Sequence, residues 1–414
     1  MFYINRGVTV VYIQRALENR IREINSQFPA LIVTGPRQVG KTTMLKNIAE
    51  TKRKYISLDD PVAREMAKSD PALFIERYSP PVLIDEIQYA PQLFPYIKMY
   101  IDEQKRAGAF WMTGSQMFHM MKNVTESLAG RVAVIQMFGL SQSELANTEN
   151  TPFIGGHEAM LQRMNSRKPQ KLDEVYARIH GGGMPAVCTG ETEWEIFYSS
   201  YLNAYLQRDI KDLAQVGDET AFMRFMTACA ARTSRMVNYA DMAKDVDISA
   251  PTAKQWLSIL VSSGIIALIQ PYFNNVLKRA IKAPNMYFMD TGLCAYLTRW
   301  DSAKTLEVSA MSGAFFETYA VSEILKSYYN AGKRPPVYYY RDTEGKEIDL
   351  LLERNGTLYP IEIKKSANPG KEAVRHFSVI EKTNLLRGEG SVVCLYRDVM
   401  PVNKNDWIVP VWLI

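Results

Sequence analysis

Residues 28–50 read FPALIVTGPRQVGKTTMLKNIAE, and this stretch decides the fold of the first part of the 414-residue chain. It opens with an apolar run over residues 30–34, which is typical of a buried strand, and it ends in a helical pattern. Between the two, residues 35–42 follow the pattern GxxxxGK[ST] of a phosphate-binding loop, in the strand-then-helix context that this pattern requires. The stretch therefore predicts a P-loop NTPase domain with a parallel sheet.

The chemistry of this loop predicts ATP and Mg²⁺ as cofactors. Glycine lets the backbone N–H groups wrap the phosphates, and the N-terminus of the following helix adds a favourable dipole. Lys41 is expected to reach the β and γ phosphates, and the hydroxyl of Thr42 is expected to ligate magnesium. The predicted nucleotide contacts in the loop are Gly35, Pro36, Arg37, Gln38, Val39, Gly40, Lys41, Thr42 and Thr43. The alternative, a Gly-Lys turn without a function, is disfavoured by the flanking strand and helix.

Two further segments supply groups for hydrolysis. In residues 80–91, PPVLIDEIQYAP, an apolar strand ends in Asp85, expected to hold magnesium through water, and Glu86, expected to orient the attacking water. The alternative is an ordinary strand that ends in two acids at a turn. The strand within residues 108–116, GAFWMTGSQ, carries Thr113, Ser115 and Gln116 at its tip, where a γ-phosphate sensor is expected. Ser115 is therefore added to the predicted nucleotide contacts.

Two arginines are candidates for the cation that stabilises charge on the leaving phosphates. Arg131, in ESLAGRVAV (126–134), closes a short helix before another strand, and the alternative is a plain helix-terminal arginine. Arg208 follows a stripe of Tyr198, Tyr201 and Tyr205, which is interpreted as core packing between domains. A buried structural ion pair is the favoured interpretation of Arg208.

Residues 238–269, NYADMAKDVDISAPTAKQWLSILVSSGIIALI, predict helix, tight turn, helix and strand. This order is that of a helix-turn-helix followed by a hairpin, a winged-helix pattern. Thr252, Lys254 and Gln255 would lie near the exposed start of a recognition helix. The predicted basic wing comprises Asn274, Asn275, Lys278, Arg279 and Lys282. DNA is therefore a candidate partner, and a protein-contact module is the alternative.

The stretch EIDLLLERNGTLYPIEIKKS (347–366) predicts a β-hairpin that turns on Asn355-Gly356. Glu362 and Lys364 are two residues apart on one strand, so both point to the same face. Asp349 on the partner strand can reach that face.

The order of predicted elements in this region, helix, three strands, helix (near 371–383) and strand, is that of a PD-(D/E)XK nuclease-like core. In such a core Asp349 and Glu362 hold magnesium, Lys364 fixes or activates the attacking water, and Glu317 adds an acid from the helix at 313–329. Whether the acids still bind metal and support cleavage is left open.

The segments GPRQVGKTT, LIDEIQ, TGSQ and SLAGR together resemble the prokaryotic AAA-superfamily ATPases whose C-terminal half is a domain of unknown function. Motifs typical of the second half of that family follow in order: GGGMP (181–185), YLQRDI (205–210), FMDTGL (288–293), GAFFETYAVSEI (313–324) and EIDLLLE (347–353). The resemblance covers nearly the whole chain. It implies an AAA-type ATPase without a settled physiological role.

The composition, 47% hydrophobic and 22% charged, is that of a globular protein, and the net charge of +5 permits a nucleic-acid partner without requiring one. The four cysteines are scattered without CxxC spacing, which favours a reducing cytoplasm over a disulfide framework. The N-terminus does not read as a signal peptide, and the apolar run at 258–273 is too short and interrupted to span a bilayer. A cytoplasmic protein without a membrane partner is expected.

These patterns predict an α/β multidomain protein. The expected parts are a P-loop, AAA-like domain at 1–165, a helical connector with a winged helix at 166–300, and an α/β nuclease-like domain at 301–414. One hypothesis is an ATP-driven enzyme that acts on DNA. The other is a nucleotide-switched regulatory or binding protein with a catalytically inactive nuclease-like domain. A homo-oligomer is compatible with both.

Overall fold

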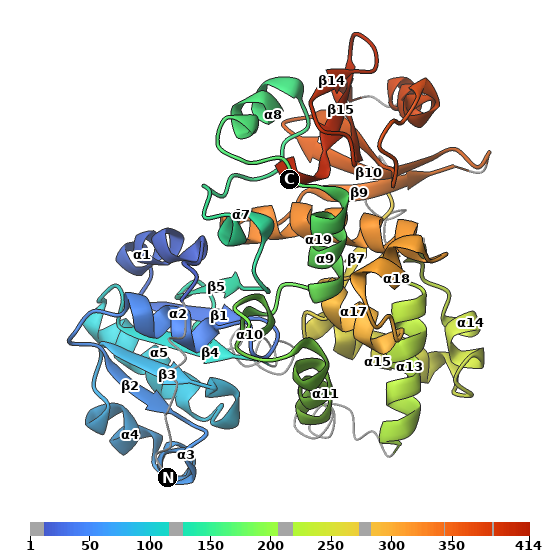
Figure 1. The fold of residues 1–414 in the computed structure, drawn as a ribbon. Helices are drawn as coiled ribbons and strands as arrows, with labels where there is room; N and C mark the ends of the chain where they lie inside the picture. The colour runs from blue at the N-terminus through green and yellow to red at the C-terminus, as the bar shows by residue number, and fades with distance from the viewer. Residues whose placement is uncertain (1–11, 116–126, 206–217, 273–282, 343, 383–384) are drawn as a thin grey trace, which may run out of the picture.

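The computed structural model describes residues 12–115, 127–205, 218–272, 283–342, 344–382 and 385–414. Three regions lie side by side in Figure 1: a blue-to-cyan α/β region, a green-to-yellow helical region and an orange-to-red strand region. Among the described residues, no helix is long and apolar enough to cross a bilayer.

The first region is built on a parallel sheet of five strands in the order β2-β3-β4-β1-β5. Its strands are β1 (Ala30–Thr34), β2 (Lys54–Ser57), β3 (Val82–Asp85), β4 (Phe110–Gly114) and β5 (Val132–Gln136). Its helices are α1 (Leu17–Gln27), α2 (Lys41–Ile48), α3 (Pro61–Ser69), α4 (Pro71–Arg77) and α5 (Leu93–Gln104), with a 3₁₀ turn η1 (Ile87–Tyr89). The predicted parallel-sheet P-loop domain is therefore confirmed.

Both faces of this sheet are covered, which explains why β1, β3 and β4 are apolar without alternation. Successive residues of a strand point to opposite faces. Leu31 and Val33 pack in one core with residues of α1 and α2, whereas Ile32 packs in a second core with residues of α4 and α5. The P-loop follows β1 at the carboxyl edge of the sheet.

The middle region is mostly helical and carries a small antiparallel sheet in the order β6-β8-β7. Its helices are α9 (Leu172–Gly181), α10 (Pro185–Cys188), α11 (Trp194–Tyr205), α13 (Glu219–Ala231), α14 (Tyr239–Lys244), α15 (Ala250–Ser262), α17 (Thr291–Leu297) and α18 (Ala303–Val308). Its strands are β6 (Arg235–Met236), β7 (Ile266–Ile269) and β8 (Asn285–Phe288).

Helix α14, a turn, helix α15 and strand β7 follow one another in the order that the sequence predicts. Ser249 caps α15 by accepting the N–H of Thr252, and Pro251 lies in the first turn, where a proline costs no hydrogen bond. Lys254 and Gln255 are exposed on this helix. The predicted wing residues Asn274, Asn275, Lys278, Arg279 and Lys282 lie outside the described residues, as do Arg208 and Gln116.

The C-terminal region combines helix α19 (Ser312–Tyr329) with a mixed sheet in the order β14-β15-β13-β11-β10-β9. Its strands are β9 (Val337–Arg341), β10 (Glu347–Arg354), β11 (Thr357–Ile363), β12 (Leu386–Arg387), β13 (Gly390–Cys394), β14 (Met400–Pro401) and β15 (Asp406–Pro410). β10 and β11 form the predicted hairpin, and both Asn355 and Gly356 have positive φ, as a type I′ turn requires. This region is a separate domain made mostly of strands.

The helix expected near 371–383 is instead a pair of 3₁₀ helices, η3 (Lys371–Val374) and η4 (Phe377–Lys382). Ala373, Phe377 and Ile380 are buried at a spacing of three to four residues. Turns of 3₁₀ helix satisfy that spacing as well as an α-helix does, because side chains at i and i+3 lie on one face.

Helix α8 (His157–Met164), which follows the short helix α7 (Gln142–Leu145), packs against the C-terminal strands rather than the P-loop sheet. Arg163 donates to the carbonyl of Leu413 at 2.7 Å, and the N–H of His157 donates to Glu389 at 2.8 Å. The sequence-based boundary at residue 165 therefore differs from the packing, which separates α8 from the P-loop region. Contacts between residues more than two hundred positions apart leave no local signal for such a boundary.

Candidate functional site

Two glycines give the P-loop its backbone path. Gly35 has φ +139, and a Cβ there would lie 1.9 Å from the carbonyl oxygen of Met137, next to β5. Gly40 has φ +92 and precedes the first residue of α2. Glycine is required at both positions because side-chain-bearing residues rarely adopt these angles, and at Gly35 a side chain would collide with backbone.

Lys41 and Thr42, at the start of α2, contact the loop and the ends of two neighbouring strands. The Lys41 side chain is buried, and its Nζ donates to the carbonyls of Gly35 at 2.9 Å and Pro36 at 2.7 Å, and to Ser115 Oγ at 3.3 Å. Thr42 Oγ1 donates to Asp85 Oδ1 at 2.6 Å. Residues from the loop, from β3 and from the end of β4 therefore meet at one edge of the sheet.

The other predicted loop contacts differ in accessibility. Val39 is buried and its carbonyl is engaged by Arg15, Arg37 is half-buried, and Gln38 and Thr43 are exposed. Gln38 has φ +59, a value that few non-glycine residues adopt. In this loop, Gln38 and Thr43 present their side chains to solvent.

Asp85 and Glu86 follow β3 at the same edge. The Asp85 carboxylate accepts hydrogen bonds from Thr42, from Thr113 Oγ1 at 2.5 Å and from the Tyr55 hydroxyl at 3.1 Å. Glu86 has the left-handed backbone angle φ +57, and its N–H donates to Thr113 Oγ1 at 3.0 Å. The hydroxyl of Thr113 thus holds both acidic residues in one arrangement.

Tyr55 is a site residue that the sequence reasoning missed. It comes from β2, and only the pairing of β2 with β3 places it beside Asp85. Burial, followed by the negative charge of Asp85, raises the pKa of Tyr55 to about 12, so it stays a hydrogen-bond donor at neutral pH. Thr113 was visible from sequence as a polar residue at a strand tip, but its double hydrogen bond was not.

The prediction that Arg131 reaches the nucleotide phosphates is corrected by the structure. Arg131 immediately precedes β5, whose first residue pairs with Ala30 at the amino edge of the sheet, whereas the P-loop follows Thr34. The two edges are roughly 13 Å apart at the rise of a parallel strand. The guanidinium forms an exposed ion pair with Asp102 of α5, with Nε 2.6 Å from Oδ1. Within one chain, Arg131 therefore lies away from the phosphate site.

The C-terminal hairpin brings the other predicted acids together. Leu350 pairs with Ile361 in the antiparallel register, so Asp349 and Glu362 are directly opposite and share a face. Asp349 accepts the N–H of Ile363 at 2.7 Å, and Lys364 Nζ lies 2.6 Å from Glu362 Oε1.

The titration behaviour of this cluster reflects crowded negative charge. Burial, followed by the charge of Glu362, raises the pKa of Asp349 to about 7. Burial, followed by the charge of Asp349, raises the pKa of Glu317 to about 8. Burial disfavours the charged form of Lys364, yet the carboxylates of Asp349 and Glu362 together raise its pKa. The four groups therefore share one electrostatic environment.

Glu317 does not join the other two acids as a ready third metal ligand. Its Oε1 accepts a hydrogen bond from the buried hydroxyl of Tyr287, on β8, at 2.8 Å. Among the described residues, no three His, Cys, Asp or Glu side chains are placed to hold a metal ion. Asp349 and Glu362 remain as a pair, and a pair fits Mg²⁺, which is often bound by one or two carboxylates together with substrate phosphates.

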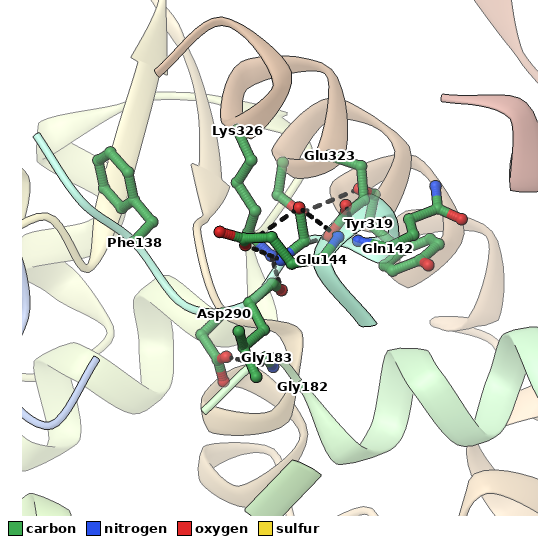
Figure 2. A network of polar contacts seen from close by, with 12 residues as sticks. Phe138, Gln142, Glu144, Gly182, Gly183, Asp290, Tyr319, Glu323 and Lys326 are labelled. Atoms are coloured by element: carbon green, nitrogen blue, oxygen red, sulfur yellow. Dashed lines mark hydrogen bonds and ion pairs between the residues drawn. The ribbon is translucent and has the colours of Figure 1, made fainter. Parts of the chain in front are cut away.

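The motifs GGGMP and FMDTGL meet in a buried polar network (Figure 2). The N–H of Gly183 donates to Asp290 Oδ2 at 2.8 Å, and the Gly183 carbonyl accepts the N–H of Leu140 at 2.6 Å. The Tyr198 hydroxyl donates to the other oxygen of Asp290 at 2.6 Å. At Gly182, which has φ +76, a Cβ would lie 2.5 Å from that hydroxyl. The glycine motif thus packs closely against the Leu140 backbone and against the side chains of Tyr198 and Asp290.

Helix α19 continues the network. Lys326 and Glu323 form a buried ion pair of 2.8 Å, Lys326 also donates to the carbonyl of Leu140 at 3.3 Å, and Glu323 accepts the N–H of Gln142 at 2.8 Å (Figure 2). The same helix carries Glu317. The segment that follows β5 is therefore tied to the helix that borders the carboxylate pair.

Arg15 links this segment to the P-loop itself. Its guanidinium donates to the carbonyls of Val39 and Phe138, each at 2.7 Å, and to Glu144 Oε1 at 2.8 Å. Burial acts to raise the pKa of Glu144. The charge of Arg15 and the hydrogen bond that Arg15 donates nevertheless hold this pKa below its ordinary value. The P-loop also touches the middle region, since a Cβ on Gly264 would lie 3.0 Å from Pro36 Cδ.

Comparison with protein families agrees with the geometry of the first region. Residues 27–146 match the family described as AAA domain, and residues 172–304 and 312–414 match two families that are each described as a domain of unknown function. The uncharacterized protein Rv2008c of Mycobacterium tuberculosis is 27% identical over 355 residues, which are 84% of this chain and 73% of that protein. The uncharacterized protein Mb2031c of Mycobacterium bovis matches to the same extent.

Among solved structures, the Walker-type ATPase PABY2304 of Pyrococcus abyssi is similar at 14% identity, with 68% of this chain and 94% of that chain covered and a TM-score of 0.42. A DNA replication initiation factor is similar at 12% identity, with 60% and 90% covered and a TM-score of 0.25. The AAA match and the P-loop geometry support ATP binding and hydrolysis. The chain therefore carries an AAA-type P-loop ATPase domain joined to a separate C-terminal domain made mostly of strands.

Proposed function

We propose that the protein is a cytoplasmic ATPase that acts on DNA through a winged helix and a nuclease-like C-terminal domain. The observation that carries the ATPase part is the convergence of Lys41, Thr42 and Asp85 at one sheet edge, with Glu86 held beside them by Thr113. The four cysteines are free, which agrees with a reducing compartment.

At the nucleotide site, backbone N–H groups of the loop and the ammonium of Lys41 would hold the β and γ phosphates. Thr42 and Asp85 would hold Mg²⁺, which when bound would offset the charge of the phosphates. Glu86 would orient the attacking water and accept its proton. Thr113 keeps the Glu86 backbone in the left-handed angle that directs its carboxylate toward Ser115 Oγ, 3.4 Å away.

The test of the ATPase part is a pair of substitutions with opposite signatures. Lys41→Ala is expected to abolish ATP binding because it removes a phosphate-pairing cation, whereas Glu86→Gln should retain binding and lose turnover. Lys52→Ala, an exposed lysine of the same region, is the matched control and should behave as the parent. Hydrolysis by Glu86→Gln at the parental rate would show that its assigned role is wrong.

The nuclease part rests on Asp349, Glu362 and Lys364 sharing one face of the hairpin. The two carboxylates would hold one divalent cation, which when bound stabilises charge on a phosphodiester. Lys364 would fix the attacking water beside Glu362. The exposed start of α15, with Lys254 and Gln255, supplies a surface compatible with DNA.

Cleavage of plasmid DNA with Mg²⁺ or Mn²⁺, with and without ATP, tests this part. Asp349→Ala should abolish cleavage, and Glu381→Gln, an exposed acid of the same domain, should not. Mn²⁺ should also raise the melting temperature of the parent, since a ligand at a hundred times its Kd stabilises by about 2.7 kcal/mol. A melting temperature that Mn²⁺ leaves unchanged would remove the metal site from the proposal.

A second candidate is a nucleotide-switched binding protein whose nuclease-like domain does not cleave. The hydrogen bond between Glu317 and Tyr287, and the lack of a three-ligand cluster among the described residues, favour this candidate. It predicts ATP-dependent retention of duplex DNA without cleavage. Loss of retention in Lys41→Ala would support it, and metal-dependent cleavage by the parent would exclude it.

A further inference from the structure

A cavity of about 690 Å³ lies in the middle region, away from both sites described above. Its walls come from the end of α9, from α11, from α13, from the end of α17 and from the turn that follows. Four aromatic rings line it: His180, Trp194, Tyr296 and Trp300. None of these residues takes part in the proposed ATPase or nuclease chemistry.

The aromatic walls are fixed by contacts with one another. The rings of His180 and Trp194 are stacked at 4.4 Å, and Trp194 meets Tyr296 edge-on at 5.6 Å. Trp194 Nε1 donates to the carbonyl of His180 at 2.9 Å, and His180 Nε2 lies 2.9 Å from the carbonyl of Trp300. Burial lowers the pKa of His180, so this wall is uncharged at neutral pH. The cavity is therefore preformed, and its four aromatic rings offer uncharged surface.

The mouth of the cavity is acidic. Glu193, Glu195 and Asp301 line it and are exposed, against a single lining cation, Arg299. Within the described part of the chain, neither Glu193 nor Glu195 forms an ion pair. Two carboxylates at the mouth are thus available to a ligand.

We propose that this cavity binds a short segment of a partner protein through a lysine or arginine side chain. A cation over a tryptophan or tyrosine ring is attracted by the ring, and the aliphatic stem of a basic side chain packs on apolar walls. The acidic mouth repels anions such as nucleotides and attracts the basic head group. The volume exceeds what one side chain fills, and the lining residues Leu202, Met223 and Leu297 offer apolar contacts for residues next to the basic one.

Calorimetric titration of the full chain with two blocked peptides tests the proposal. The probes are a heptapeptide with a central arginine between leucines and the same peptide with glutamine in place of arginine. The arginine peptide should bind saturably, and the glutamine peptide should bind at least about tenfold more weakly, because it lacks the cation–π and charge attraction. Rising salt should weaken only the arginine peptide.

Two variants assign the binding to this cavity. Glu193→Gln/Glu195→Gln should weaken the arginine peptide about fivefold or more, while the equally exposed pair Glu65→Gln/Glu76→Gln, on the P-loop domain, should bind as the parent. Trp300→Leu should also weaken binding, with an unchanged melting temperature as the check on folding. Equal affinity for the two peptides would overturn the proposal, as would parental binding by the Glu193/Glu195 variant. Saturable binding of spermidine without binding of the peptide would equally overturn the assignment to a protein partner.

Discussion

Removing Lys326 should destabilise the protein far more than removing a surface lysine or arginine. Lys326 Nζ lies 2.8 Å from Glu323 Oε1, and the two side chains are only 5% and 4% exposed. The other carboxylate oxygen of Glu323 holds the N–H of Gln142. Lys326→Met fills a similar volume but leaves the Glu323 charge buried without its partner.

The size of the effect follows from this burial. Breaking a buried ion pair by removing one partner costs about 3–5 kcal/mol, because an uncompensated charge stays in a low-dielectric site. Arg20 and Glu23 provide a matched control, since they are also three residues apart on a helix and 2.7 Å apart, but 42% and 59% exposed. An exposed pair contributes about 0–1 kcal/mol. Arg20→Met should therefore cost several-fold less than Lys326→Met.

The double variant Glu323→Gln/Lys326→Met separates a charge effect from a packing effect. Glutamine removes the buried charge and still offers an oxygen to the N–H of Gln142, so the double variant should recover much of the lost free energy of unfolding. Urea denaturation followed by tryptophan fluorescence gives the differences between variants. A Lys326→Met cost no larger than that of Arg20→Met, or a double variant as unstable as the single one, would refute the reasoning.

Three further outcomes are expected. Thr113→Val should lower the kcat for ATP hydrolysis by about ten- to a hundredfold with little change in KM, because Glu86 loses the hydroxyl that positions it. Thr113→Ser keeps a hydroxyl and should restore the rate in a steady-state assay. Gly35→Ala should abolish binding of a fluorescent ATP analogue, because the added Cβ would lie 1.9 Å from the Met137 carbonyl, whereas Gly313→Ala, with open space around its Cβ, should bind normally. Without metal, the melting temperature should fall as pH rises from about 4 to 8. The pKa values of Asp349 and Glu317 are raised in the folded state, so in this pH range the folded state binds more protons than the unfolded state and loses stability as protons are removed. Asp349→Asn should flatten this slope in a thermal melt, and an unchanged slope would contradict the assignment.

Much of the nucleotide site was readable from the sequence because its chemistry is local. A strand, a glycine loop and a helix lie within 23 consecutive residues, and the spacing of Lys41 and Thr42 after Gly35 follows from the path of a chain around phosphates. The hairpin was readable for a similar reason. Successive side chains of a strand point to opposite faces, and the Asn355-Gly356 turn sets which residues of the two strands are opposite each other. The sequence alone therefore placed Asp349, Glu362 and Lys364 on one face.

Other assignments depended on which distant elements pack together. Tyr55 reaches Asp85 only because β2 pairs with β3, and Arg131 leaves the phosphate site because the parallel register puts the start of β5 at the opposite sheet edge. Glu317 meets Tyr287 instead of serving as a free third acid, although 30 residues separate the two.

By itself, then, the sequence determined the phosphate loop, the acidic pair after β3 and the shared face of the hairpin, because strand and turn geometry act over a few residues. Only the tertiary structure decided that Gly183 faces Asp290 and that Lys326 and Glu323 hold the segment after β5. Aspartate, glutamate and lysine are mostly exposed in proteins, so nothing in the local sequence marks these three as buried. Their roles are set by burial and by partners far along the chain, which no local periodicity encodes.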